Sequence, residues 1–196
     1  MLRFRVLGFP VRVEPMFFLI MGLFGVAGGR EGVYVAEWIV VAGFGILVHE
    51  LGHALAFRRF GSPAEIVLHG FGGFTTGQAQ PPRRSIVVSV AGPAMGFAAG
   101  AIGVWLYRSV GSDSELLNYA LSDLIFVTVV WGVFNLLPIL PLDGGAVVAS
   151  ALEQATGGGG QRAARPRCRR ARSGSSRAPA NACQFWNPKK AATMAM

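Results

Sequence analysis

The chain has 196 residues, of which 52% are hydrophobic and only 14% are charged. Soluble domains carry roughly 25% charged residues, so this composition disfavours a soluble protein and indicates a small bundle of membrane helices. The net charge of +8 is unevenly distributed: residues 1–156 hold nine arginines and ten acidic residues, a net charge of −1, whereas residues 157–196 hold nine basic residues and no acidic one. The basicity therefore belongs to residues 157–196 and does not indicate a nucleic-acid surface on the body, so we expect no nucleic-acid partner.

The first predicted elements are two short strands and an apolar helix. Residues 2–13 alternate apolar and basic side chains around Gly8 and Pro10, which predicts a pair of strands at the membrane surface. The apolar run 15–29 is the first predicted span. It is shorter than the ~20 residues that usually cross a bilayer, so it would tilt or draw on flanking residues.

Three longer apolar runs and a glycine-rich segment follow. The runs are residues 33–57, 85–107 and 119–137, each long enough to cross a bilayer. Between the first two, residues 64–80 have strand character on both sides of a cluster of glycines, which predicts a β-hairpin beside the membrane. A brief helix is expected after the last run.

These elements predict an all-α membrane protein, a polytopic bundle of about four transmembrane helices with a small membrane-surface β-sheet or hairpin. Residues 1–156 would form this domain. Arginines gather before the first span and between residues 58 and 84, so the positive-inside tendency places the N-terminus and this loop in the cytoplasm. Gly92, Gly96 and Gly100 lie four residues apart, which favours close helix packing within the chain over a dimer interface.

Residues 157–196 form a basic, low-complexity tail with no Leu, Ile, Val, Asp or Glu. Such a composition cannot bury a core, so we expect this tail to be disordered. The abrupt change after residue 156 equally indicates an out-of-frame or truncated translation product. Both cysteines lie in this tail, so no disulfide framework or cysteine metal site is expected in the body.

Ionisable side chains stand inside the second span, where burying them is costly. His49 and His53 are four residues apart, so on a helix both imidazoles lean from one face and can fill two positions around zinc. Glu50 is rotated by about 100° and can reach a water molecule beside the metal without binding the metal. This H-E-x-x-H arrangement is typical of zinc proteases that use the glutamate as general base. The alternative is a pair of hydrogen-bonded core histidines with a buried glutamate partner.

Zinc held by two histidines needs a third protein ligand. The segment after His53 supplies no histidine, and the best candidate is Asp143, ninety residues further along the chain. Pro138 and Pro141 prevent a continuous helix there, so we expect a loop that folds back into the bundle with Asp143. Gly144 and Gly145 would permit close approach of the backbone.

Two motifs together, HELGH at 49–53 and NLLPILPLDGG at 135–145, resemble the site-2 protease family of intramembrane zinc metalloproteases. The resemblance covers roughly residues 1–155 and includes FPVRVEPMFFL, GFGGFT and SVAGPAMGF. It implies one Zn²⁺ per chain, with the ligands and base named above. It also implies that Asn135 helps to hold the substrate, although a hydrogen bond in helix packing is an equally good role for this side chain.

The resulting prediction is a multi-pass cell-membrane zinc metalloendopeptidase that hydrolyses peptide bonds of membrane-spanning proteins, with its active-site side towards the cytoplasm. The partners would be the substrate and the lipid bilayer. The 64–76 hairpin could pair with unwound substrate by strand addition, with Gly72 and Gly73 allowing close approach, or could simply cap the site. The alternatives are an inactive or truncated metal-binding relative that binds membrane peptides without cleavage, and a small ion transporter.

Overall fold

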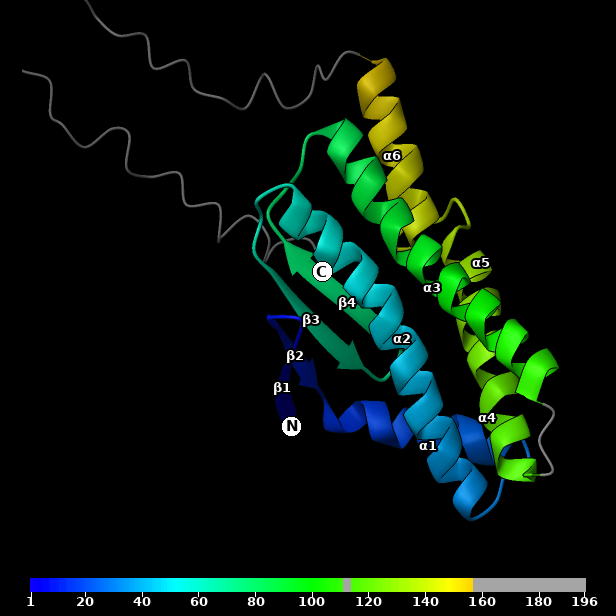
Figure 1. Cartoon of the computed structure of the whole chain (residues 1–196). Helices are drawn as coiled ribbons and strands as arrows, with labels where there is room; N and C mark the ends of the chain where they lie inside the picture. Colours follow the sequence, from blue (N-terminus) through cyan, green and yellow to red (C-terminus); the bar gives the residue numbers. More distant parts are fainter. Residues whose placement is uncertain (111–113, 157–196) are drawn as a thin grey trace, which may run out of the picture. The chain divides into compact units, whose positions relative to one another are not determined.

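The computed structural model describes residues 1–110 and 114–156, and the predicted disordered tail lies outside the described residues. The elements, in chain order, are β1 (Leu2–Val6), β2 (Phe9–Val13), α1 (Pro15–Ala27), α2 (Val33–Arg59), β3 (Ala64–His69), β4 (Gly72–Gly77), α3 (Pro82–Val110), α4 (Glu115–Ile125), the π-helical η1 (Phe126–Val130), α5 (Trp131–Asn135) and α6 (Asp143–Ala155) (Figure 1). The predicted fold class, a helical membrane bundle with a small sheet, is confirmed.

Three helical runs of the described part are long and apolar enough to cross a membrane: Val33–Arg59, Pro82–Ser109 and Glu115–Asn135. The expected first span is shorter than these. Helix α1 has 13 residues, a rise of about 20 Å, which is less than the ~30 Å of a bilayer core. Three rather than four of the described helices therefore have the length to cross unaided.

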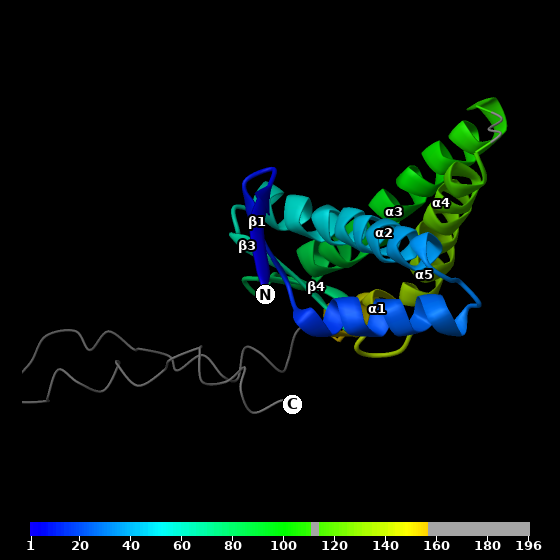
Figure 2. The same cartoon turned by 90° about the horizontal axis from the view of Figure 1, so that it is seen from below.

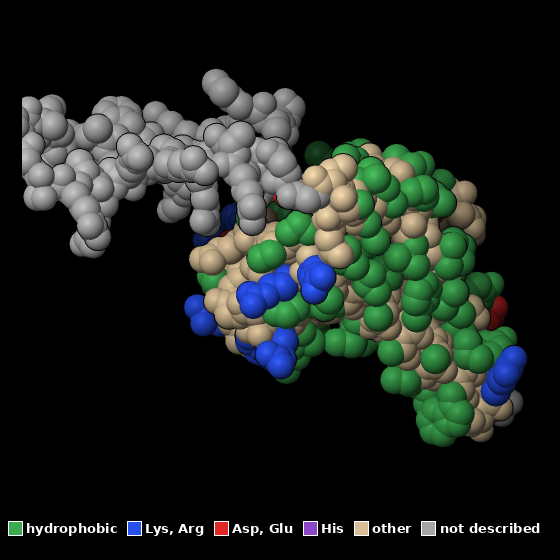
Figure 3. Space-filling model, turned by 90° about the horizontal axis from the view of Figure 1, so that it is seen from above, with side chains coloured by type: hydrophobic (Ala, Val, Ile, Leu, Met, Phe, Trp, Pro, Cys, Tyr) green, Lys and Arg blue, Asp and Glu red, His purple; other side chains and the backbone are tan. Residues whose placement is uncertain are grey.

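The helices expose many large apolar side chains, as expected for surfaces that face lipid. Ile102 and Trp105 on α3, for example, have 59% and 64% of their surface exposed. Figure 3 shows hydrophobic side chains spread along the helical part, whereas most of the visible basic side chains gather over one end. This separation of apolar and basic surface matches a protein that sits in a bilayer with one end among lipid headgroups.

The strands form one sheet in the order β1-β2-β3-β4. Strands β1 and β2 form one antiparallel hairpin, and β3 and β4 form another, as the sequence predicted. A parallel pairing of β2 with β3 joins the two hairpins, with Val11 opposite Ile66 and Val13 opposite Leu68. All four of these side chains are buried, so burial of the alternate apolar side chains stabilises the pairing of β2 with β3. Strand β4 is left at the edge of the sheet.

The hydrophobic core lies between this sheet and helices α1 and α2. Phe17 of α1 and Ile46 and Ala54 of α2 pack with the buried strand side chains. Figures 1 and 2 show α1 beside the N-terminal half of α2 and the sheet beside its C-terminal half. The C-terminal half of α2, which carries the H-E-x-x-H motif, is thereby held against β3 and β4.

Helix α3 packs on another side of α2 through small residues. A Cβ at Gly52 of α2 would meet the backbone of Ala91 in α3, so the two helices approach closely. Further along α3, a Cβ at Gly96 would lie 3.3 Å from the carbonyl oxygen of Thr128, and one at Gly100 would lie 2.7 Å from Cγ2 of Val129. The glycines of α3 therefore serve packing within the chain, as predicted.

Candidate metal centre

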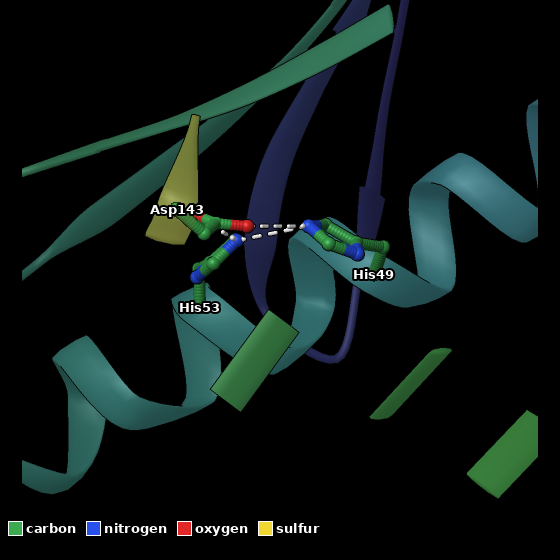
Figure 4. A group of neighbouring side chains, drawn as sticks. All are labelled: His49, His53 and Asp143. Atoms are coloured by element: carbon green, nitrogen blue, oxygen red, sulfur yellow. Dashed lines mark hydrogen bonds and ion pairs between the residues drawn. The ribbon is translucent and has the colours of Figure 1, made fainter. Parts of the chain in front are cut away.

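His49 and His53 lie one turn apart on α2, and both are buried, with 7% of their surface exposed. Their imidazole rings point towards each other, and the two Nε2 atoms are 3.2 Å apart (Figure 4). The helical spacing alone brings the rings to one face of α2.

Asp143 completes the cluster from a distant part of the chain. One carboxylate oxygen, Oδ2, lies 3.1 Å from Nε2 of His49, and the other, Oδ1, lies 3.4 Å from Nε2 of His53. The expectation that Asp143 stands in an irregular loop is corrected in one respect: it is the first residue of α6, and the irregular segment 136–142 precedes it. A helix start restrains the aspartate more firmly than a loop would.

The two glycines after Asp143 allow the fold-back. A Cβ at Gly144 would overlap the carbonyl groups of Leu136 and Leu137, and one at Gly145 would lie 2.6 Å from the carbonyl oxygen of Ile139. The start of α6 therefore lies against the backbone of the preceding segment, and any larger residue would push Asp143 away from α2.

The three side chains fit zinc. Zn²⁺ in proteins is tetrahedral, with bonds of about 2.0–2.1 Å to histidine nitrogen and carboxylate oxygen, which sets neighbouring ligand atoms about 3.3 Å apart. The two imidazole nitrogens, 3.2 Å apart, agree with that value. The two contacts of Asp143 are made by different carboxylate oxygens, and one ligand atom from each of the three residues lies within 4.8 Å of the others. A tetrahedral ion held by three protein ligands keeps a fourth position for water or substrate, as catalytic zinc sites do.

His53 is further oriented by its second ring nitrogen, since Nδ1 lies 2.7 Å from the carbonyl oxygen of Val88 on α3. A carbonyl can only accept, so Nδ1 carries the hydrogen and Nε2 keeps its lone pair free for a metal. Gly92, also on α3, leaves the space that the ring occupies, because a Cβ there would overlap the imidazole of His53.

The carboxylate of Asp143 is stabilised in its charged form. Burial alone would raise the pKa of this group, but hydrogen bonding and charge interactions with His49 and His53 outweigh burial, so the pKa of Asp143 lies below its ordinary value. A metal ligand of this kind must be deprotonated, and this environment favours that state.

Glu50 lies beside the cluster without belonging to it. Its side chain is buried, with 5% of the residue exposed, and its Oε2 accepts a hydrogen bond of 2.7 Å from the hydroxyl of Thr75 on β4. The carboxylate thus lies in the same cavity as the three candidate ligands, on the side of strand β4, and is not one of them.

A cavity of about 670 Å³ opens against these residues, and Glu50, Asp143 and both imidazoles line it. The predicted substrate-binding residues Asn135, Gly72 and Gly73 line the same cavity. A Cβ at Gly73 would lie 2.7 Å from Cγ of Glu50, so a larger residue there would displace the Glu50 side chain. The cavity joins the metal cluster to strand β4 and the end of α5, so a peptide bound in it would meet both.

Comparison with known proteins gives a consistent result. Rip3 of Mycobacterium tuberculosis, which is named as a zinc metalloprotease, is 33% identical over 175 residues, covering 76% of this chain and 42% of Rip3. The zinc metalloprotease MJ0392 of Methanocaldococcus jannaschii is 27% identical over 157 residues, covering 79% of this chain and 46% of that protein. The solved site-2 protease of the same organism has this fold, with a TM-score of 0.61 at 23% identity, over 78% of this chain and 72% of that one. The chain belongs to the site-2 protease family.

This member of the site-2 protease family spans less than half the length of the curated relatives that it matches. No protein-family model matches the chain. The names of the relatives imply zinc, and His49, His53 and Asp143 are the possible ligands found among residues 1–110 and 114–156. The apolar helices and the family together make it a membrane protein.

Other polar residues of the sequence have local partners. The Nδ1 atom of His69 accepts a hydrogen bond of 3.3 Å from the backbone N–H of Phe71, within the β3–β4 turn. His69 lines the cavity but does not belong to the group of three possible ligands. Asp123, in the fourth apolar run, is buried and forms an ion pair with Arg30 from the segment between α1 and α2. Asp123 therefore serves the fold, and His69 has a local partner in the turn.

Three residues that shape the site, Thr75, Val88 and Gly92, were missed as site residues by sequence reasoning. Gly92 had a sequence signal, the small-residue spacing of α3, but that spacing indicates helix packing rather than space for an imidazole. Val88 contributes only its backbone carbonyl, which no side-chain pattern can reveal. Thr75 lies 25 residues from Glu50, and only the position of β4 on α2 joins them.

Proposed function

We propose that this protein is an intramembrane zinc metalloendopeptidase that cleaves membrane-spanning protein substrates. One observation carries the proposal: two imidazoles and a carboxylate lie close enough together to share one metal ion within an apolar helical bundle, with a further buried carboxylate beside them. Burying ionisable side chains within a bilayer is energetically costly, so their presence inside a membrane span indicates a function. The names of the relatives support the same chemistry.

The position of each side chain indicates its role in the reaction. Bound zinc would activate a water molecule and polarise the scissile carbonyl. His49, His53 and Asp143 would hold the ion. Glu50 would take the proton of the attacking water and later deliver it to the leaving amine, as general base and then general acid. Its carboxylate is free for this role because it is not one of the three ligands.

Strand β4 would hold the substrate. A peptide in a helix has its carbonyl groups in internal hydrogen bonds, so it must unwind before attack. The free edge of β4 borders the cavity, and an extended peptide could add to this edge by main-chain hydrogen bonds. Gly72 and Gly73 line the cavity there, and Gly73 lets the strand lie against Glu50, so a peptide on this edge would run close to that side chain. Asn135, at the end of α5, would hold a backbone group of the same peptide from the other side of the cavity.

The active-site side would face the cytoplasm in a multi-pass arrangement. His49 precedes Arg58 by nine residues of helix, a rise of about 13 Å, so the cluster would lie within the bilayer but nearer the arginine-rich end. The positive-inside tendency assigns that end to the cytoplasm.

Co-expression with candidate single-span membrane proteins tests the proposal. The wild-type protein is expected to shorten a substrate to a product cut within its span, and Glu50→Ala is expected to abolish the product while retaining zinc. A product that forms equally with Glu50→Ala would contradict the proposed mechanism. Zinc retention without any cleavage by the wild type would instead favour a metal-binding relative that captures peptides.

A further inference from the structure

The carboxylate of Glu50 is held by a side chain of the sheet. The hydroxyl oxygen of Thr75 lies 2.7 Å from Oε2 of Glu50 and 3.1 Å from the backbone carbonyl oxygen of the same residue. A hydrogen bond to an ionised carboxylate is shorter and stronger than one between neutral groups. The shorter contact is therefore the one that the hydroxyl makes when Glu50 is charged.

The face of β4 that meets α2 is built around this contact. Side chains alternate along a strand, so positions 73, 75 and 77 share one face. A Cβ at Gly73 would lie 2.7 Å from Cγ of Glu50, and one at Gly77 would lie 2.6 Å from Cδ1 of Phe57. The strand thus lies so close to α2 that a side chain at either neighbour of Thr75 on this face would displace Glu50 or Phe57. Thr75 is the one side chain of β4 that reaches α2 on this face, and it ends on Glu50.

We propose that Thr75 is the positioning residue for the general base, fixing the carboxylate of Glu50 beside the metal ligands. The inference rests on the proposed function, since Glu50 needs a fixed orientation only if it moves protons. Rotation about the side-chain bonds of Glu50 would otherwise let its carboxylate turn away from the cavity. A misplacement of about 1 Å in an active site can cost on the order of 100-fold in rate.

Thr75 can hold Glu50 before and after proton transfer without moving. A hydroxyl has one hydrogen to donate and two lone pairs to accept with. With Glu50 ionised, the hydroxyl donates to Oε2. Once Glu50 has taken a proton, its O–H can donate to the hydroxyl oxygen of Thr75, and the hydroxyl can turn its own hydrogen to the backbone carbonyl at 3.1 Å. Both acceptors are already in place, so no atom heavier than hydrogen has to shift.

The same strand carries the proposed substrate edge. A peptide that adds to β4 would be placed in register with Thr75, and through Thr75 with the base. Substrate docking and base orientation would then depend on one rigid element, with Ile66 of β3 paired opposite Thr75.

Thr75→Val and Thr75→Ser, compared with Thr76→Val, test this role. Valine keeps the shape of threonine and removes the hydroxyl, serine restores the hydroxyl, and Thr76 lies on the same strand with its hydroxyl on the carbonyl of Glu65 instead. In liposomes with a cleavable single-span substrate, Thr75→Val should lower kcat by about 10- to 100-fold with little change in KM. Thr75→Ser should recover most of kcat, and Thr76→Val, which removes no contact to Glu50, should keep a much higher kcat than Thr75→Val. Zinc content should stay the same in all variants.

Loss of activity in Thr75→Ser equal to that in Thr75→Val would overturn the proposal, because it would show that threonine serves only packing. Equal kcat for Thr75→Val and Thr76→Val would overturn it as well. A second measurement is independent of cleavage and compares the changes in thermal midpoint in one detergent. The changes caused by Thr75→Val and Glu50→Ala should not add up to the change in the double variant, whereas the changes caused by Thr76→Val and Glu50→Ala should add up in theirs. If the wild type cleaves nothing, the proposed function fails, and additive midpoints for Thr75 and Glu50 would separately refute the contact.

Discussion

Gly92 offers a sharp test of the metal site, because it lies outside the ligand set and yet controls a ligand. A Cβ at this position would lie 2.8 Å from Cδ2 of His53 and closer still to Nε2 and Cε1. Real Cβ atoms do not approach a ring so closely, so in Gly92→Ala the imidazole must move. The hydrogen bond from Nδ1 to the carbonyl of Val88, at 2.7 Å, opposes that movement.

The expected cost follows from what the ring would lose. To clear a methyl group, Nε2 of His53 must leave the triangle that it forms with Nε2 of His49 and the carboxylate of Asp143, or the bond to Val88 must break. Loss of a partner that orients a metal ligand typically lowers metal affinity by about 10- to 100-fold. We expect Gly92→Ala to lower zinc affinity by at least this amount, while the helix itself gains from the better propensity of alanine.

The assay is zinc retention by purified protein in detergent, equilibrated with a graded series of a competing chelator. Gly96→Ala is the matched control on the same face of α3, because its Cβ would lie 3.3 Å from the carbonyl oxygen of Thr128 and 3.8 Å from Nδ1 of His49, without overlapping a ligand. Equal zinc retention by the two variants would refute the placement of His53 against Gly92. Monodisperse elution of both variants guards against simple unfolding.

Two further predictions concern other parts of the bundle. Asp143→Ala should remove stoichiometric zinc, since two imidazoles alone do not complete the site, whereas His69→Ala should keep it; full zinc occupancy in Asp143→Ala by elemental analysis would exclude the aspartate as a ligand. Asp123→Ala should leave the guanidinium of Arg30 without its buried partner, and breaking such a pair costs roughly 3–5 kcal/mol. The thermal midpoint of Asp123→Ala in detergent should fall well below that of the wild type. The control is Glu31→Ala, which changes an exposed side chain and should keep a higher midpoint. Equal midpoints for the two variants would show that the ion pair contributes nothing to stability.

The parts of the fold that depend on local pattern could be predicted from the sequence. The long apolar runs predicted the three helices that are long enough to span a membrane. Segments of strand character on either side of glycine turns predicted both β-hairpins. The parallel pairing of Val11 with Ile66 could not be predicted, because it joins segments 55 residues apart through two intervening helices. The length of α1 also differs from expectation: its helix ends at Ala27, before the glycines and Arg30 that lead into α2.

In the candidate site, too, some residues could be predicted from local sequence spacing, whereas the positions of others depend on tertiary packing. The spacing of His49 and His53 places them together on any helix, so sequence alone brings them to one face. Asp143 was identified by its chemistry and motif, but its position at the start of α6 depends on the packing of Gly144 and Gly145 against the preceding backbone. Thr75 depends on the docking of a sheet edge on α2, and this tertiary contact has no local signal.

Zinc itself gives the most direct test of the account. The full chain, purified without chelator and shown to be folded, should contain one zinc ion, and X-ray absorption at the zinc edge should reveal two imidazole ligands together with oxygen. Folded protein without stoichiometric metal, or zinc with no imidazole in its coordination, would contradict the assignment of His49, His53 and Asp143 as a metal site.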